Sequence, residues 1–209
     1  MLADVQRGLE TLYRIETDLD VRHFVIDAET RDAIGVARPA REQLLVSEAD
    51  GDVHLALFVD DRALANLAAN DPRRRLDGSN LQDFLLTVEG VSHFVYVAWR
   101  AQRKRPVSAL ELELQAEIDK YVTCVLTLRG QGGVGDLVPR LFDEWTLAPG
   151  MDADERERYL VANSNARAYA TAIDARYVAR DDVPGMLDEL RRFYRLGVAD
   201  KLSAIARAA

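Results

Sequence analysis

The sequence predicts an α+β protein that is mostly α-helical, with a small N-terminal antiparallel β-sheet and a central antiparallel helical hairpin. Three observations predict this fold class. Two apolar runs surround Asp50-Gly51, a dipeptide that supplies the positive φ of tight turns and is typical of a β-hairpin. The segments 80–103 and 109–129 repeat apolar residues at helical spacing. The chain after Gly150 shows helical periodicity again, over 152–178 and 185–207.

Composition sets the class of protein. The chain has 209 residues, of which 48% are hydrophobic and 30% charged, so we expect one domain over 1–209. Its sheet-containing part covers about 1–70 and its helical part about 78–209. The single cysteine excludes an internal disulfide and favours a reducing compartment. No apolar run approaches the roughly 20 residues that span a bilayer. We expect a cytoplasmic protein that does not associate with membranes.

The net charge of −8 argues against general nucleic-acid binding, which usually requires a basic surplus. Two short basic clusters, Arg73–Arg75 and Arg103–Arg105, stand beside turn residues. We interpret both as solvated turns, with phosphate contact as the alternative.

The N-terminal elements follow from periodicity and turn residues. Apolar residues at helical spacing predict a helix over 2–17 rather than a signal peptide, and "VRHFVID" over 21–27 is typical of a strand. The hairpin follows at 42–60. Asp60 or Asp61 is placed to cap a short helix through "RALANLAAN". Pro72 and Gly78 then mark a loop.

The segment 80–103 allows two interpretations. Its aromatic and β-branched content favours a strand. Ser79 and Gln82 have capping-box spacing, however, and one helical face is apolar over five turns. That face consists of Leu81, Phe84, Leu85, Val88, Ser92, Val95 and Trp99. We therefore predict one helix.

The next helix is delimited more clearly. Pro106 stops the preceding helix, Ser108 and Glu111 form a second capping box, and Gly130 ends the segment. A turn at 105–107 predicts that the helices 80–103 and 109–129 fold back antiparallel.

This geometry gives a candidate site. Glu89 and His93 are four residues apart, so they are neighbours on one helix face. Tyr96 and Arg100 extend their stripe, and a fold at Pro106 brings a stripe of the second helix opposite it. The second stripe consists of Glu113, Glu117 and Lys120.

Buried ionisable groups are costly unless they are paired, so a structural network is the favoured interpretation of this cluster. The alternative is a pocket in which Glu89, His93 and Glu117 are catalytic. Its ligand-binding residues would be Tyr96, Arg100, Glu113 and Lys120. The spacing matches neither the His-Glu-x-x-His of zinc proteases nor the Glu-x-x-His of di-iron bundles. We therefore expect no metal and no cofactor.

The stretch "RGQGGVGD" contains Gly130, Gly132 and Gly135 at the spacing G-x-G-x-x-G, with a helix start at Asp136. A dinucleotide site needs a strand before this loop, and here a helix precedes it, so we predict a connection without nucleotide or coenzyme A. Together with "VANSNARAY", the loop resembles the pyrophosphate loop of the GCN5-related acetyltransferases. The resemblance implies that Gly133, Gly135 and Asn165 contact an acyl-coenzyme A.

Three further features complete the candidates. A metal between His23 and His54, as a cross-strand pair, is disfavoured, and Cys124 in an apolar helix predicts a buried, inert thiol. The C-terminal stripe forms either core or a surface for a partner helix. That stripe is Leu187, Leu190, Phe193, Tyr194, Val198, Leu202 and Ile205.

The function expected from the sequence is a cytosolic interaction or regulatory protein without its own catalysis, with a protein partner or self-association. One alternative is an enzyme or small-ligand-binding protein that uses the Glu/His/Glu cluster. The second is a divergent acyl-coenzyme A-binding protein of acetyltransferase type.

Overall fold

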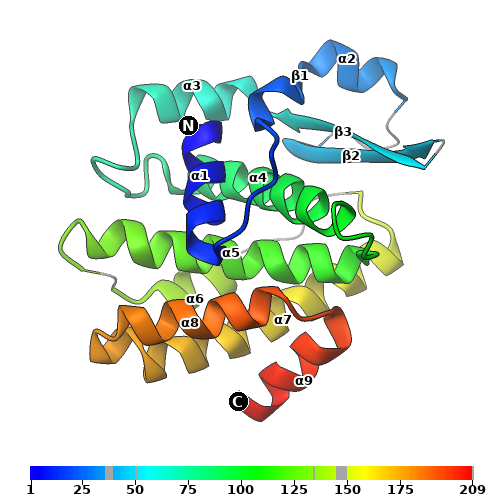
Figure 1. The fold of residues 1–209 in the computed structure, drawn as a ribbon. Coiled ribbons are helices and arrows are strands. Elements are labelled where there is room, and N and C mark those ends of the chain that lie inside the picture. The colour runs from blue at the N-terminus through cyan, green and yellow to red at the C-terminus, as the bar shows by residue number, and fades with distance from the viewer. Residues whose placement is uncertain (36–39, 50, 134, 145–149, 209) are drawn as a thin grey trace. The chain divides into compact units, whose positions relative to one another are not determined.

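The computed structural model describes residues 1–35, 40–49, 51–133, 135–144 and 150–208 (Figure 1). The fold is α+β and mostly helical, as predicted. The chain divides into two compact units. Unit 1 comprises residues 1–10 and 16–105, and unit 2 comprises residues 11–15 and 106–209. The prediction of a single domain stays a prediction.

Unit 1 contains a three-stranded sheet of order β1-β3-β2. Its strands are β1 (Val25–Ile26), β2 (Glu42–Ala49) and β3 (Asp52–Val59). The predicted hairpin is confirmed, because β2 and β3 pair antiparallel without interruption from Glu42↔Val59 to Ala49↔Asp52. Gly51 has the positive φ expected of the turn, at 86°, and Asp50 lies outside the described residues. β1 pairs parallel to β3, so the sheet is mixed rather than purely antiparallel.

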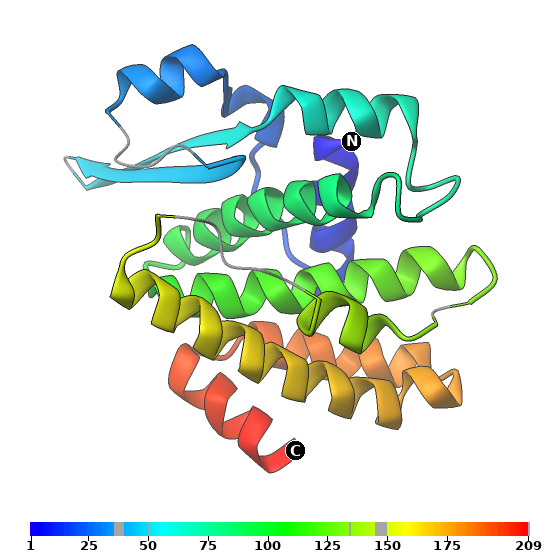
Figure 2. The same cartoon turned by 180° about the vertical axis from the view of Figure 1, so that it is seen from behind.

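Helices of unit 1 pack against this sheet and against one another. The helix α4 (Leu81–Ala101) packs against β2 and β3, and α3 (Asp61–Ala69) packs against α4 (Figure 2). The short α2 (Ala28–Ala33) contacts the sheet through Arg31, whose guanidinium lies 4.1 Å from the centre of the Phe58 ring. As predicted, Asp60 caps α3, accepting a hydrogen bond from the amide of Arg62.

Two N-terminal predictions are wrong in their extent. The first helix, α1 (Leu2–Tyr13), is shorter than 2–17, because Arg14 adopts a positive φ of 50°. The strand predicted over 21–27 is a 3-10 turn, η1 (Val21–His23), followed by the two residues of β1. Asp20 and Asp27 cause this, since their carboxylates accept backbone hydrogen bonds that start η1 and α2.

The ambiguity at 80–103 is resolved in favour of the helix, since α4 is continuous through its aromatic and β-branched residues. The predicted capping box is wrong. Asn80, not Ser79, is the N-cap residue, and the Ser79 hydroxyl donates instead to Asp77 at 2.7 Å. The long-range periodicity of apolar residues therefore outweighed local strand propensity, whereas the cap depended on a local competitor.

Unit 2 is helical, and α5 packs along α7, which also contacts α6 and α9 (Figure 2). Its elements are α5 (Ala109–Arg129), α6 (Leu137–Phe142), α7 (Ala153–Arg176), η2 (Val178–Arg180), α8 (Val183–Tyr194) and α9 (Val198–Ala208). Ser108 caps α5 as predicted, 3.2 Å from the amide of Glu111. The helix predicted over 185–207 is two helices, α8 and α9, interrupted at Gly197. Helices α4 and α5 belong to different units, so their antiparallel arrangement stays a prediction.

Candidate functional site

His93 is buried in the middle of α4, and its described partner is a residue that the sequence did not indicate. The Nδ1 atom of His93 lies 3.6 Å from Oε1 of Glu42, the first residue of β2. Both side chains are almost fully buried. A carboxylate carried by a strand therefore meets the histidine within unit 1.

Gly90 makes this contact sterically possible. A Cβ atom at Gly90 would lie 2.8 Å from Cγ of Glu42 and 3.1 Å from Cδ1 of Leu57. The glycine lies about one turn before His93 on the same helix, so it lets β2 bring its carboxylate down onto α4. A glycine inside a strongly periodic helix was thus the available signal that another chain segment approaches closely.

The remaining predicted residues occupy both units. Tyr96 is fully buried, and the guanidinium of Arg100 lies 5.6 Å from the centre of its ring, while Glu89 is half-buried. These three residues are on α4. On α5, Lys120 donates to Glu117 at 2.6 Å, and Glu113 is half-buried. The meeting of Glu117 with Glu89 and His93 stays a prediction.

Unit 2 contains a buried polar cluster that sequence reasoning missed, which we call the lysine network: Tyr13, Gln115, Asp119 and Lys201. Lys201 on α9 donates to Oε1 of Gln115 at 2.6 Å. The Gln115 amide in turn donates to Oδ1 of Asp119 at 2.8 Å and to the Tyr13 hydroxyl at 3.2 Å. Tyr13 donates to the same Asp119 oxygen. All four side chains are buried, and Lys201 is completely so.

The orientation of the Gln115 amide follows from its neighbours. Its oxygen faces the Lys201 ammonium, which can only donate, and its nitrogen faces the Asp119 carboxylate. The amide dipole therefore lies between a buried cation and a buried anion. Lys201 also lies 5.4 Å from the centre of the Phe193 ring and 5.9 Å from that of Tyr194. Such contacts compensate part of the cost of burying an ammonium group.

Burial raises the pKa of Tyr13 well above its ordinary value, and the nearby Asp119 carboxylate raises it further. The phenol is thus held protonated as a hydrogen-bond donor. Its backbone is fixed as well, because Arg195 donates to the Tyr13 carbonyl at 3.1 Å and the ring stacks on Tyr194 with centroids 3.8 Å apart. The lysine network together with the Tyr194 and Arg195 contacts therefore anchors residues 11–15 to α5, α8 and α9.

The sequence signal for the lysine network was incomplete. Gln115 and Asp119 are four residues apart on one helix, a spacing that places polar side chains beside each other. Tyr13 and Lys201 come from opposite ends of the chain, and no local pattern links them to α5.

The other candidates are placed as follows. His54 lies opposite Ser47 in the hairpin while His23 is in η1, so the two are not a cross-strand pair. Cys124 is buried as predicted, and burial raises the pKa of its thiol to about 12. Within the described ranges, no three His, Cys, Asp or Glu residues are arranged to hold a metal ion.

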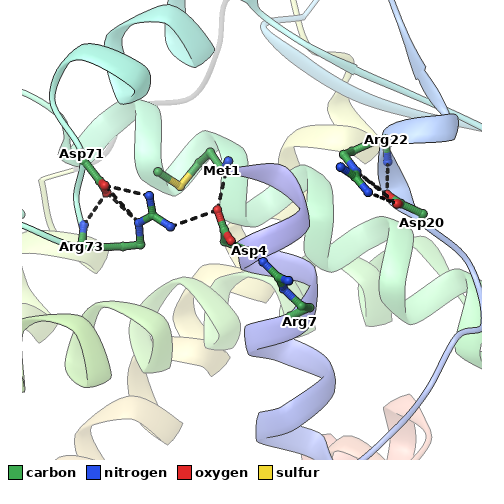
Figure 3. Close-up of polar contacts among 7 residues, drawn as sticks. All are labelled: Met1, Asp4, Arg7, Asp20, Arg22, Asp71 and Arg73. Carbon is green, nitrogen blue, oxygen red and sulfur yellow. Dashed lines mark hydrogen bonds and ion pairs between the residues drawn. The ribbon is translucent and has the colours of Figure 1, made fainter.

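The basic clusters contact neighbouring groups of the protein. Arg73 bonds to Asp71 at 2.8 Å and to Asp4 at 3.2 Å, and Asp4 also receives Arg7 and the α-ammonium of Met1 (Figure 3). Figure 3 also shows the separate local pair Asp20–Arg22. At the end of α4, the guanidinium of Arg103 lies 4.6 Å from the centre of a Trp99 ring. These contacts agree with the interpretation as turns.

The glycine loop follows a helix, because α5 occupies the region in which an acetyltransferase would need strands. Gly132, Gly133 and Gly135 have positive φ, which suits a connection between helices. The amide of Asn165 donates to the Val161 carbonyl of its own helix at 2.8 Å. In the C-terminal stripe, Leu190, Phe193, Tyr194 and Ile205 are buried, and Leu187, Val198 and Leu202 are partly so.

The hairpin itself presents a different kind of surface. We call Val46–Ala49 of β2 together with 52–55 of β3 the outer hairpin. Opposite residues of an antiparallel pair share a face, so Val46/Leu55 and Glu48/Val53 continue the face on which Leu44/Leu57 packs toward α4. Leu57 is completely buried, whereas Val46 is 47% exposed and Val53 is 38% exposed. The apolar face of the sheet thus continues past the part that packs against α4 and is exposed at Val46 and Val53.

Comparisons of the chain with protein-family models, with curated proteins and with solved structures found no match. In the described part of the chain, no helix combines the length and the apolar character needed to cross a membrane.

Proposed function

We propose that this protein is a cytosolic interaction protein without catalysis of its own, and that the outer hairpin is its binding surface. The observation that carries the proposal is the exposure of Val46 and Val53 on the face that forms core farther along the same strands. Contiguous exposed apolar groups rimmed by polar ones are typical of interaction sites.

The ionisable clusters support a non-catalytic interpretation. His93 and Glu42 are buried against each other, and Tyr13, Gln115, Asp119 and Lys201 hydrogen-bond among themselves in the core. A catalytic acid or base must reach a substrate proton within hydrogen-bonding distance. The buried side chains of the lysine network satisfy one another's hydrogen bonds, and such groups contribute structure instead. The alternatives with an enzyme pocket or an acyl-coenzyme A site are therefore less well supported.

Selection from a displayed peptide library tests the proposal. Peptides selected on the wild-type protein are measured against the double variant Val46→Ser/Val53→Ser. The matched control is Ile34→Ser/Leu160→Ser, which removes apolar side chains that are 58% and 51% exposed elsewhere. We expect the hairpin variant to bind the selected peptides about tenfold more weakly or worse, because central apolar anchors carry most of the binding energy, and the control to bind like wild type. Equal affinity of all three proteins would refute the outer hairpin as the binding surface.

A further inference from the structure

The proposed function, on which this inference rests, leaves the chemistry of the partner open. We infer that the partner segment is an extended chain that adds to β2 as a fourth strand. Its apolar residues stand at alternate positions, with a lysine or arginine two positions beyond them.

The edge of β2 is suited to strand addition. In the strand order β1-β3-β2, β2 has a neighbouring strand on one side only, within the described residues. Its eight residues pair with β3 in unbroken register, so its backbone has the regular geometry that a further strand requires. Proteins usually protect such an edge with lysine, proline or a bulge. The sequence of β2, "EQLLVSEA", has neither lysine nor proline, and its register contains no bulge. Its two charged residues, Glu42 and Glu48, lie near its ends.

The side chains beside that edge specify an apolar and basic partner. On the face toward α4, β2 presents Leu44, Val46 and Glu48 in succession. A strand beside it gains apolar contact at the first two positions, and a cation at the third lies beside Glu48. Residues 46–55 contain three acidic side chains and neither lysine nor arginine. An acidic segment is therefore repelled and a basic one is attracted.

The same charges disfavour a second copy of this chain as the occupant. A second β2 strand added in parallel register would bring its own Glu48 and the same acidic turn opposite those of the first strand. Like charges brought together across a strand pair are destabilising.

The test uses the full-length protein and an acetylated, amidated peptide of sequence Lys-Thr-Val-Thr-Val-Thr-Lys. Its lysines and valines share one face, and its symmetry permits parallel or antiparallel addition. Calorimetric titration should show binding to the wild type. Binding should be about fivefold weaker when both lysines of the peptide are replaced by glutamate, the scale expected for charge pairs across strands. For the Glu48→Lys protein this preference should be reversed.

Backbone methylation tests the mode of binding. In a strand, alternate N–H groups point to opposite edges, so one peptide is methylated at its valine nitrogens and another at its threonine nitrogens. Only the peptide methylated on the edge that faces β2 should lose binding, by more than about tenfold, because several hydrogen bonds are lost together. Equal binding of both methylated peptides would overturn strand addition.

Three other outcomes also overturn this inference. They are no binding of the lysine peptide, preference for the glutamate peptide, and a dimer in sedimentation that Val46→Ser disrupts. The proposed function is judged separately by the peptides selected from the library. Selected peptides whose binding depends on Val46 and Val53, but which lack alternate apolar residues followed by a lysine or arginine, would support the proposed function and reject strand addition by a basic segment. If the library peptides do not depend on Val46 and Val53 and the lysine peptide does not bind, both the proposed function and the inference are rejected.

Discussion

The two buried polar clusters differ in how their partners are supplied. In unit 1, the His93–Glu42 pair joins one helix to one strand at 3.6 Å, longer than a hydrogen bond. In unit 2, the lysine network joins α5, α9 and residues 11–15 through donor–acceptor distances of 2.6 to 3.2 Å. The pair depends on a glycine that lets a strand approach, whereas the network depends on an amide placed between opposite charges. We therefore expect the network to be the more costly of the two to break.

The largest effect should come from Asp119→Asn, which removes the buried anion and keeps the shape of the side chain. Breaking a buried charge arrangement by removing one member costs about 3–5 kcal/mol. We expect a loss of that size in urea unfolding. The double variant Asp119→Asn/Lys201→Met should recover part of it, because the buried cation is removed as well. An additive double variant would show that the two charges do not act through Gln115.

The corresponding change in unit 1 is His93→Ala. We expect the free energy of unfolding to fall by about 1–3 kcal/mol, the usual cost of leaving a buried partner unsatisfied. A His93→Ala variant as stable as wild type or more stable would contradict a structural role and indicate a functional site. Glu42→Ala and the double variant His93→Ala/Glu42→Ala complete a double-mutant cycle. The losses of the two single variants should not add in the double variant if His93 and Glu42 act together. Thermal and urea unfolding of the three variants distinguish these results.

The close approach at Gly90 gives a smaller effect. In Gly90→Ala, the new Cβ would lie 2.8 Å from Glu42 Cγ, so β2 or its side chain must shift. Overpacking of this kind costs about 1–3 kcal/mol, and the higher helix propensity of alanine returns up to about 1 kcal/mol. We expect a net loss near 1 kcal/mol by these magnitudes. Gly8→Ala is the matched control, because a Cβ atom at Gly8 would have nothing within 4 Å; a stabilised Gly90→Ala would show that the contact with Glu42 is dispensable.

The sequence predicted helices more reliably than it predicted contacts. Helix α4 was predictable because its apolar face repeats over many turns, which no strand sustains. Residues 21–27 were misassigned because Asp20 and Asp27 capture backbone amides, a competition that apolar periodicity does not register. The hairpin was predictable from its turn residues and flanking apolar runs.

Candidate site residues were predictable only where their partners are close in sequence. Lys120 meets Glu117 three residues away, and Arg100 lies over Tyr96 four residues away. Glu42 reaches His93 from a distant strand, and Lys201 reaches Gln115 from the far end of the chain. Contacts of this kind depend on how elements pack, and one sequence contains no local signal for them.

The smallest expected effect is a change in how stability depends on pH, which should arise from the lysine network and not from the His93–Glu42 pair. The pKa of Tyr13 is raised in the folded protein above its ordinary value of 10.0, first by burial and then by Asp119. Above pH 10 the unfolded chain therefore loses a proton that the folded chain keeps, so stability falls as pH rises. At pH 10.5 this contribution is below about 1 kcal/mol per group. Tyr13→Phe removes the phenol, so its stability should fall less steeply between pH 9 and 10.5 than that of wild type, whatever its stability at pH 8. His93→Ala should keep the wild-type slope in the same urea titrations, because it leaves Tyr13 in place. Parallel slopes for wild type and Tyr13→Phe would mean that the phenol is not held protonated by the lysine network.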